Sequence, residues 1–235
     1  AIDFGDLTQA LTQMAGCSTE TRGVFAGGGD VSAVAVNVIQ YITIASVGNA
    51  TDFGDLLEAR RQLAGCASST SGFFSGGTTN GSTVPNVIQT ITIGTPGNST
   101  DFGDLTTEVR WAAGCSNAAA AVQATPTSSA MAIFTGGTTT LQYVNIDTTG
   151  NSYLFGDLSI ARQTFAGCAS STRGVFGGGT GPSNVIDYVT FLTFGNAIDF
   201  GDLTVAREEL ASASNSTRGL FAGGAPSVGR SNVID

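Results

Sequence analysis

Short runs of alternating apolar and polar residues recur along the chain, with "YITI" at 41–44 and "YVTF" at 188–191 as clear examples. A period of two, with β-branched and aromatic residues prominent, is typical of a strand with one buried face. Turn sequences separate these runs, among them Gly76-Gly77 and "TPGN" at 95–98. The stretch "ALTQMAG" at 10–16 could pass for a helical turn, but it runs too quickly into glycine. The pattern therefore predicts an all-β protein.

The runs belong to an internal repeat. The phrase "DFGDL" occurs at Asp3, Asp52, Asp101 and Asp199, and as "LFGDL" at Leu154. Its phenylalanines lie at 4, 53, 102, 155 and 200, so the spacings are 49, 49, 53 and 45 residues. Five repeat units, starting near 3, 52, 101, 154 and 199, fill residues 1–235. We expect a single domain and leave open that it is part of a longer chain.

Each repeat contains four segments with strand character. In the second repeat they are "RQLAGCASS" at 61–69, "SGFFSGG" at 71–77, "NVIQTITIG" at 86–94 and "STDFGDL" at 99–105. Four strands in a unit of this length are typical of a propeller blade, and stacking blades in a ring buries both faces of each. The repeat predicts a β-propeller of five four-stranded blades. Six or seven blades are the alternative if further sequence flanks it. An N-terminal strand that completes the last blade is the usual closure of a propeller, and the shortened fifth repeat indicates either a ring closed one strand short or a piece of a longer array.

One stretch of the repeat carries a family resemblance. It reads "ETRGVFAGG" at 20–28, "STRGVFGGG" at 171–179 and "STRGLFAGG" at 216–224. An aromatic residue followed by a glycine pair, ending the second strand of such a unit, resembles the Kelch repeat, which implies a propeller with four antiparallel strands per blade. The usual tryptophan later in the repeat is missing, since the only tryptophan is Trp111. These phrases, together with "GNATDFGDL" at 48–56, are also similar to Kelch-like repeat proteins of marine bacteriophages, which implies a place on the virion or its tail.

Composition and charge narrow the partners. All nine basic residues are arginine, lysine and histidine are absent, and the formal net charge is −9. Such a field repels phosphate backbones and anionic headgroups, so nucleic acid and membrane surfaces are poor partners. No apolar run reaches the ~18 residues that a membrane-spanning helix needs, so we expect no membrane insertion.

An aspartate follows the glycine of every copy of the phrase, at Asp6, Asp55, Asp104, Asp157 and Asp202. A carboxylate in so tight a setting accepts backbone N–H groups or pairs with an arginine of an adjacent strand. The arginine candidates lie five residues downstream or in the "TRG" segments: Arg60, Arg162 and Arg207, or Arg22, Arg173 and Arg218. We expect these repeated residues to have a structural role.

Metal binding and catalysis have weaker support, and we expect no cofactor. The alternative is a calcium site, because Asn98, Asp101 and Asp104 offer the oxygen ligands that calcium prefers. Without histidine or lysine, the chain has no Ser-His-Asp triad, lysine Schiff base or histidine metal site. An extracellular carbohydrate-active hydrolase using two carboxylates remains an alternative to a non-enzymatic protein.

The four cysteines, Cys17, Cys66, Cys115 and Cys168, each lie thirteen residues after the phenylalanine of the phrase. The fifth equivalent position is Ala213. One cysteine per repeat, replaceable by alanine, indicates a small buried apolar slot, so we expect free thiols; disulfides and metal ligation are the alternatives.

The third repeat departs from the others in the longer segment 116–130. Insertions of this kind emerge on one rim of a repeat protein, where loops carry specificity. Asn117, Gln123, Thr125 and Ser128 are therefore the binding candidates. With the resemblance above, we expect a structural or attachment module of a phage particle, on the virion or extracellular and able to oligomerise. Its partner would be another virion protein or a host-surface glycan, and a protein-binding scaffold is a further alternative.

Overall fold

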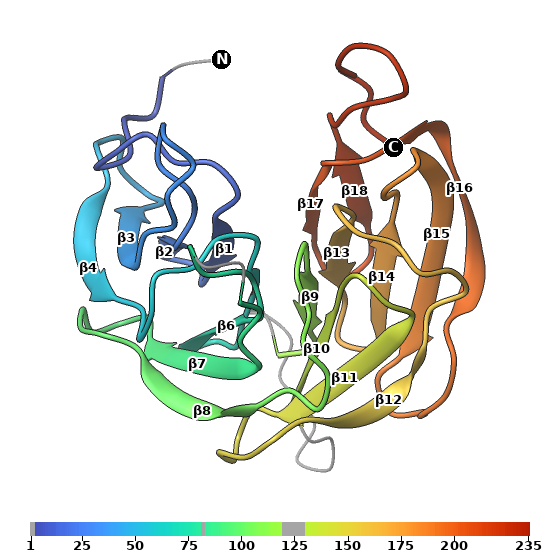
Figure 1. Ribbon diagram of the computed structural model, residues 1–235, viewed down its shortest axis with the longest axis horizontal. Helices are drawn as coiled ribbons and strands as arrows, with labels where there is room; N and C mark the ends of the chain where they lie inside the picture. The colour runs from blue at the N-terminus through green and yellow to red at the C-terminus, as the bar shows by residue number, and fades with distance from the viewer. Residues whose placement is uncertain (1–2, 81–82, 119–129) are drawn as a thin grey trace.

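The computed structural model describes residues 3–80, 83–118 and 130–235 (Figure 1). Over these ranges the regular elements are β-strands, as the alternating pattern predicts. A search of the same ranges found no helix with the length and hydropathy needed to span a membrane. Four antiparallel sheets of four strands follow one another along the chain, and in each the strand order is the order in the sequence.

The strands of each sheet are consecutive and joined by short connections. The first sheet comprises β1 (Ala15–Ser18), β2 (Arg22–Ala26), β3 (Val38–Thr43) and β4 (Thr51–Asp55). The second comprises β5 (Ala64–Ala67), β6 (Ser71–Ser75), β7 (Val87–Thr92) and β8 (Thr100–Asp104). The third comprises β9 (Ala113–Ser116), β10 (Met131–Thr135), β11 (Thr140–Asn145) and β12 (Tyr153–Asp157). The fourth comprises β13 (Ala166–Ala169), β14 (Arg173–Gly177), β15 (Ser183–Thr190) and β16 (Ile198–Arg207). A fifth, smaller sheet holds β17 (Ala211–Ser214) and β18 (Gly219–Ala222).

The sheets are arranged radially, as Figure 1 shows, with the first strand of each nearest the centre. Neighbouring inner strands contact one another in the order β1, β5, β9, β13 and β17. The "DFGD" phrase forms the outermost strand of the blade before the repeat that it opens, so the chain steps outward and then back to the centre. This is the architecture of a β-propeller.

The fifth repeat does not form the four-stranded blade that the repeat count predicts. Its third segment joins β18 only through residues 233–235, where the backbones of Phe221 and Asp235 exchange hydrogen bonds of 3.0 Å. No outermost strand pairs with this sheet among the described residues, and residues 3–6, the first copy of the phrase, lie elsewhere. Phe4 and Asp6 accept hydrogen bonds from Gly48 and Ala50 of the first blade, at 2.7 and 2.8 Å. The structure thus has four complete blades and one partial sheet, and residues 3–6 do not complete the last blade.

The "FG" of the phrase marks a β-bulge. Where β3 pairs with β4, Ile39 lies opposite Gly54 and Gln40 opposite Asp52, so Phe53 is the extra residue. Its side chain is buried in a core cluster with Phe74 and Ile91 of the next blade. Gly54 has φ +144°, and a β-carbon there would lie 2.4 Å from the carbonyl oxygen of Gly97, so glycine is required. The phrase therefore joins each blade to its successor.

The cysteines form a second contact between blades. A β-carbon at Gly72 would lie 2.9 Å from the sulfur of Cys17, in the preceding blade, and one at Gly219 would lie 2.8 Å from the sulfur of Cys168. The glycine of the "RG" or "SG" pair thus leaves room for the thiol of the neighbouring repeat. This close packing gives a physical reason for the recurrence of both residues.

Candidate functional site

Five equivalent residues, each nine positions after the phenylalanine of the phrase, share an unusual backbone conformation. Their φ angles are positive, between 52° and 66°, although none is glycine. The five are Gln13, Gln62, Trp111, Thr164 and Glu209. Non-glycine residues in this left-handed region cost of order 1–3 kcal/mol and cluster at functional sites. Each repeat thus holds a strained residue just before its inner strand.

Backbone hydrogen bonds link these positions from repeat to repeat. The N–H of Gln62 donates to the carbonyl of Gln13 at 2.9 Å, and the N–H of Thr164 donates to the carbonyl of Trp111 at 3.3 Å. The N–H of Glu209 donates to Thr164 at 2.7 Å, and Ala112 donates to Gln62 at 3.4 Å. This chain of bonds holds the five residues around the propeller axis.

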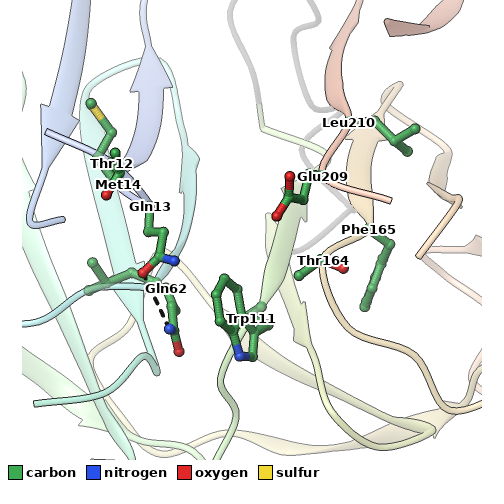
Figure 2. Close-up of a pocket in the computed structure, with 11 residues that line it drawn as sticks. Thr12, Gln13, Met14, Gln62, Trp111, Thr164, Phe165, Glu209 and Leu210 are labelled. Atoms are coloured by element: carbon green, nitrogen blue, oxygen red, sulfur yellow. Dashed lines mark hydrogen bonds between the residues drawn. The ribbon is translucent and has the colours of Figure 1, made fainter. Parts of the chain in front are cut away.

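The five residues line a shared cavity of about 600 Å³. Figure 2 shows Trp111 between Gln62 and Glu209, with Thr164 beyond it. The apolar residue after each position completes the wall: Met14, Leu63, Ala112, Phe165 and Leu210. Volumes of ~300–1,000 Å³ with apolar walls and a few polar groups are typical of small-molecule sites. We call this cavity the axial pocket.

The side chains of the axial pocket offer different chemistry. The amide of Gln62 donates to the amide oxygen of Gln13 at 3.3 Å, which leaves further donors and acceptors on both groups. Trp111, partly buried, provides an apolar ring face with an N–H at its edge. Glu209 supplies a carboxylate that lies 3.5 Å from the guanidinium of Arg230. One position repeated five times therefore displays four kinds of side chain.

The repeated aspartates and arginines lie apart from the axial pocket. The backbone N–H of Asp55 donates to the side chain of Asn98 at 3.0 Å, and those of Asp6, Asp104 and Asp157 make the same bond to the matching asparagines. Asp202 is exposed on β16. These bonds again join each blade to the next one.

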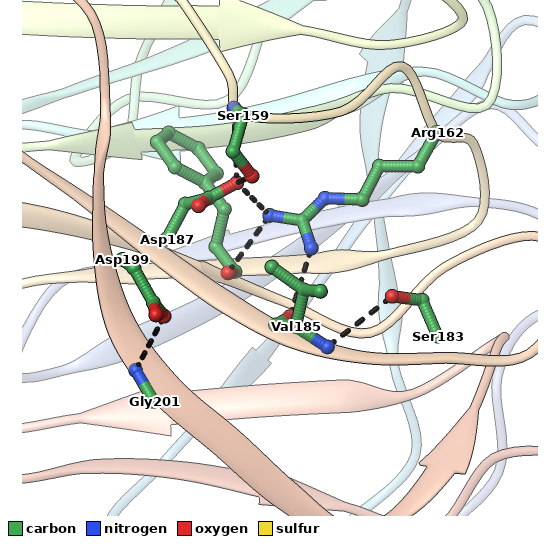
Figure 3. A network of polar contacts seen from close by, with 8 residues as sticks. Ser159, Arg162, Ser183, Val185, Asp187, Asp199 and Gly201 are labelled. Atoms are coloured by element: carbon green, nitrogen blue, oxygen red, sulfur yellow. Dashed lines mark hydrogen bonds and ion pairs between the residues drawn. The ribbon is translucent and has the colours of Figure 1, made fainter.

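The prediction that these aspartates pair with the downstream arginines is wrong. Arg162 is buried and donates to Asp187 on β15 at 2.8 Å, and Figure 3 shows this pair with Ser159, whose hydroxyl also donates to Asp187 at 2.8 Å. Arg207 pairs in the same way with Asp235. The guanidinium of Arg162 also donates to the carbonyls of Phe176 on β14 and Val185 on β15, which places it beside Asp187. Arg60, also buried, lies 3.6 Å from Glu58.

The arginines of the "TRG" segments also make other contacts. Arg22 donates to the carbonyl of Ile93 at 2.7 Å, in the next blade, and lies over the ring of Tyr41 at 4.6 Å. Arg173 lies over Tyr188 at 4.5 Å. Arg218 and Arg173 both line a smaller pocket of about 140 Å³ between the fourth and fifth sheets. Cation–π contacts of this kind hold side chains against their own sheet.

The loop candidates are only partly placed. Gln123, Thr125 and Ser128 lie outside the described residues. Asn117 is buried, and its side-chain oxygen accepts the N–H of Met131 at 2.7 Å. This bond joins the end of β9 to the start of β10, which gives Asn117 a structural environment.

The candidate metal and thiol groups have structural environments as well. The carboxylate of Asp101 accepts the N–H of Gly103 at 3.0 Å, and within the described ranges no three His, Cys, Asp or Glu side chains form a metal cluster. The four cysteines are free, and burial raises the pKa of Cys168 to about 11. A thiol with so high a pKa is protonated at neutral pH and is a poor nucleophile.

The axial pocket is the feature that the sequence reasoning missed. The position nine residues after the phenylalanine reads Gln, Gln, Trp, Thr, Glu, and the residues on both sides of it vary as well. What the five positions share is a positive φ angle, which their residue types do not indicate.

Comparisons with known proteins add no family assignment. A scan against protein-family models found no match, and a search of curated proteins found no similar sequence.

Proposed function

We propose that this chain is a non-enzymatic attachment module that binds a glycan in the axial pocket. The observation that carries the proposal is the convergence of five equivalent, strained residues with different side chains on one cavity. The fold does not need these side chains, since glycine would adopt the same conformation without strain. Strain retained at one place in every repeat is a mark of function.

A sugar ring suits the chemistry of this pocket. A pyranose presents C–H groups on its face and hydroxyls around its edge. The partly buried indole of Trp111 offers an apolar surface for that face, and the amides of Gln13 and Gln62 offer donors and acceptors for the hydroxyls. A phosphate-bearing ligand is disfavoured by the net charge of −9. The volume of about 600 Å³ accommodates a short oligosaccharide.

The biological setting follows from the sequence resemblance. The phrases around the glycine pairs support a Kelch-type propeller, and their similarity to repeat proteins of marine bacteriophages supports a place on the virion. There the axial pocket would engage a host-surface glycan, while a rim of the propeller would contact another virion protein. An extracellular hydrolase has less support, because a two-carboxylate mechanism needs a pair, and Glu209 is the one carboxylate among the described lining residues.

The test is the substitution Trp111→Gln, which installs the side chain that the first two repeats carry at the same backbone conformation. On an array of oligosaccharides we expect binding to fall at least tenfold with the melting temperature unchanged. Deletion of residues 119–129 is the matched control and should leave sugar binding intact. Equal binding by the wild type and the Trp111→Gln protein would contradict the proposal.

A further inference from the structure

The charge at the axial pocket is one-sided. Among the described residues that line it, Glu209 carries the only ionisable group, and its carboxylate is half exposed. Glu208, whose carboxylate accepts the hydroxyl of Thr164 at 3.3 Å, is not one of these lining residues. A ligand in the pocket therefore meets Glu209 as the one carboxylate of the described lining.

Arg230 offsets this charge only in part. Its guanidinium lies 3.5 Å from the carboxylate of Glu209, but the side chain of Arg230 is 77% exposed and that of Glu209 is 53% exposed. Exposed pairs of this kind are weak and screened by salt. Arg230 is not among the lining residues either, so the charge that a ligand in the pocket meets directly is that of Glu209, inside a protein whose net charge is −9.

We infer that the axial pocket selects uncharged sugars and rejects uronic acids, with Glu209 as the residue that decides. The inference rests on the proposed function. Ionised Glu209 can only accept hydrogen bonds, so it fits a sugar hydroxyl, which donates. The carboxylate of a uronic acid has no proton to donate and repels Glu209. At about 4 Å in water this repulsion amounts to a factor of about five in affinity.

The test uses matched probes: neutral gluco-, galacto- and manno-oligosaccharides, each beside its counterpart with the C6 alcohol oxidised to a carboxylate. Affinities are measured by calorimetry at low ionic strength. The wild type should bind the neutral member at least about fivefold more tightly. Glu209→Gln keeps the size of the side chain, removes the charge, and should bring the two affinities within about twofold.

For a second variant we expect the opposite change in the preference for the neutral sugar. Arg230→Gln removes the partial compensation and should widen the preference for the neutral sugar. Equal affinity for both probes in the wild type, or a preference unchanged by Glu209→Gln, would overturn this inference while leaving glycan binding in place. Failure of every sugar to bind would overturn the proposed function and this inference together.

Discussion

The second and fourth blades bury an arginine at the same place and neutralise it differently. In the fourth, Arg162 and Asp187 have fully buried side chains 2.8 Å apart. In the second, Arg60 is 1% exposed, and the position of Asp187 is taken by Gln89. The nearest carboxylate is Glu58, 3.6 Å away and half exposed. The same architecture thus contains a matched and an unmatched version of one interaction.

Both versions leave polar atoms without partners, but different ones. Within the described residues, buried atoms that make no hydrogen bond include the Nε of Arg60 and the amide nitrogen of Gln89 in the second blade, and the Nε of Arg162 and the Oδ1 of Asp187 in the fourth. Burial lowers the pKa of Arg60, and Glu58 opposes this only partly. The other repeats show what the fold prefers: Leu11 with Gln40 and Val109 with Gln142, or arginine with aspartate. The repeat therefore tolerates an apolar residue with glutamine or an arginine with aspartate. The second blade combines the arginine of one pair with the glutamine of the other.

The largest expected effect comes from replacing each arginine by leucine, the residue of the first repeat. Arg162→Leu leaves Asp187 buried without its partner and should lower the free energy of unfolding by about 3–5 kcal/mol. Arg60→Leu removes a charge that has no buried partner and should cost no more than about 1 kcal/mol. Urea unfolding followed by Trp111 fluorescence measures both. Equal losses would show that the two arginines are equivalent after all.

A double substitution checks the reason for the difference. Arg162→Leu with Asp187→Gln copies the pair of the first repeat, Leu11 and Gln40, into the fourth. It should recover most of the stability that the single substitution loses, because no charge is left buried. A double variant as unstable as the single one would place the loss in packing instead of charge.

An intermediate effect is expected from completing the pair in the second blade. Gln89→Asp removes the unpaired amide nitrogen and gives Arg60 a buried carboxylate, so stability should rise by about 1–2 kcal/mol. Gln40→Asp in the first blade is the matched control, because Leu11 offers no charge there, and it should be destabilising. Thermal unfolding of both variants gives the signs. The same sign in both would rule out pairing with Arg60.

The repeat fixes much of this fold in advance. Strand alternation, turn glycines and the recurring phrase are local signals, and they predict four-stranded blades arranged radially. The arginine partner was mispredicted because the contact between Arg162, which precedes β13, and Asp187 on β15 is a tertiary feature. Asp187 lies twenty-five residues beyond Arg162, and no local pattern joins them. Comparing repeats would have helped, since "NVID" follows the arginine in the fourth and fifth repeats.

The partial fifth sheet could not be predicted from the sequence, for a related reason. Phe53 and Phe102 are 3% and 5% exposed because a following blade covers them, whereas Phe200 is 57% exposed. The phrase is the same in each case, so its local sequence does not report whether a neighbour is present. The axial pocket was missed because its five positions share a backbone conformation and not a residue type.

The smallest effect concerns the third pair, Arg207 and Asp235, in the partial sheet. Desolvation raises the pKa of Asp235, but hydrogen bonds from Thr204 and the charge of Arg207 outweigh it and hold the pKa below its ordinary value. A carboxyl whose pKa is lower when folded stabilises the protein above its unfolded pKa of about 3.9. That contribution is lost as the pH falls through the folded pKa.

The stability difference between wild type and Asp235→Asn should therefore be constant from pH 7 to pH 5 and shrink below about pH 4. Urea unfolding at each pH measures it, and a difference that stays constant to pH 2 would show that the charge of Asp235 contributes nothing here. In that case the stability lost by Arg162→Leu in the fourth blade, where the pair is fully buried, would have to arise from the burial of Asp187 alone.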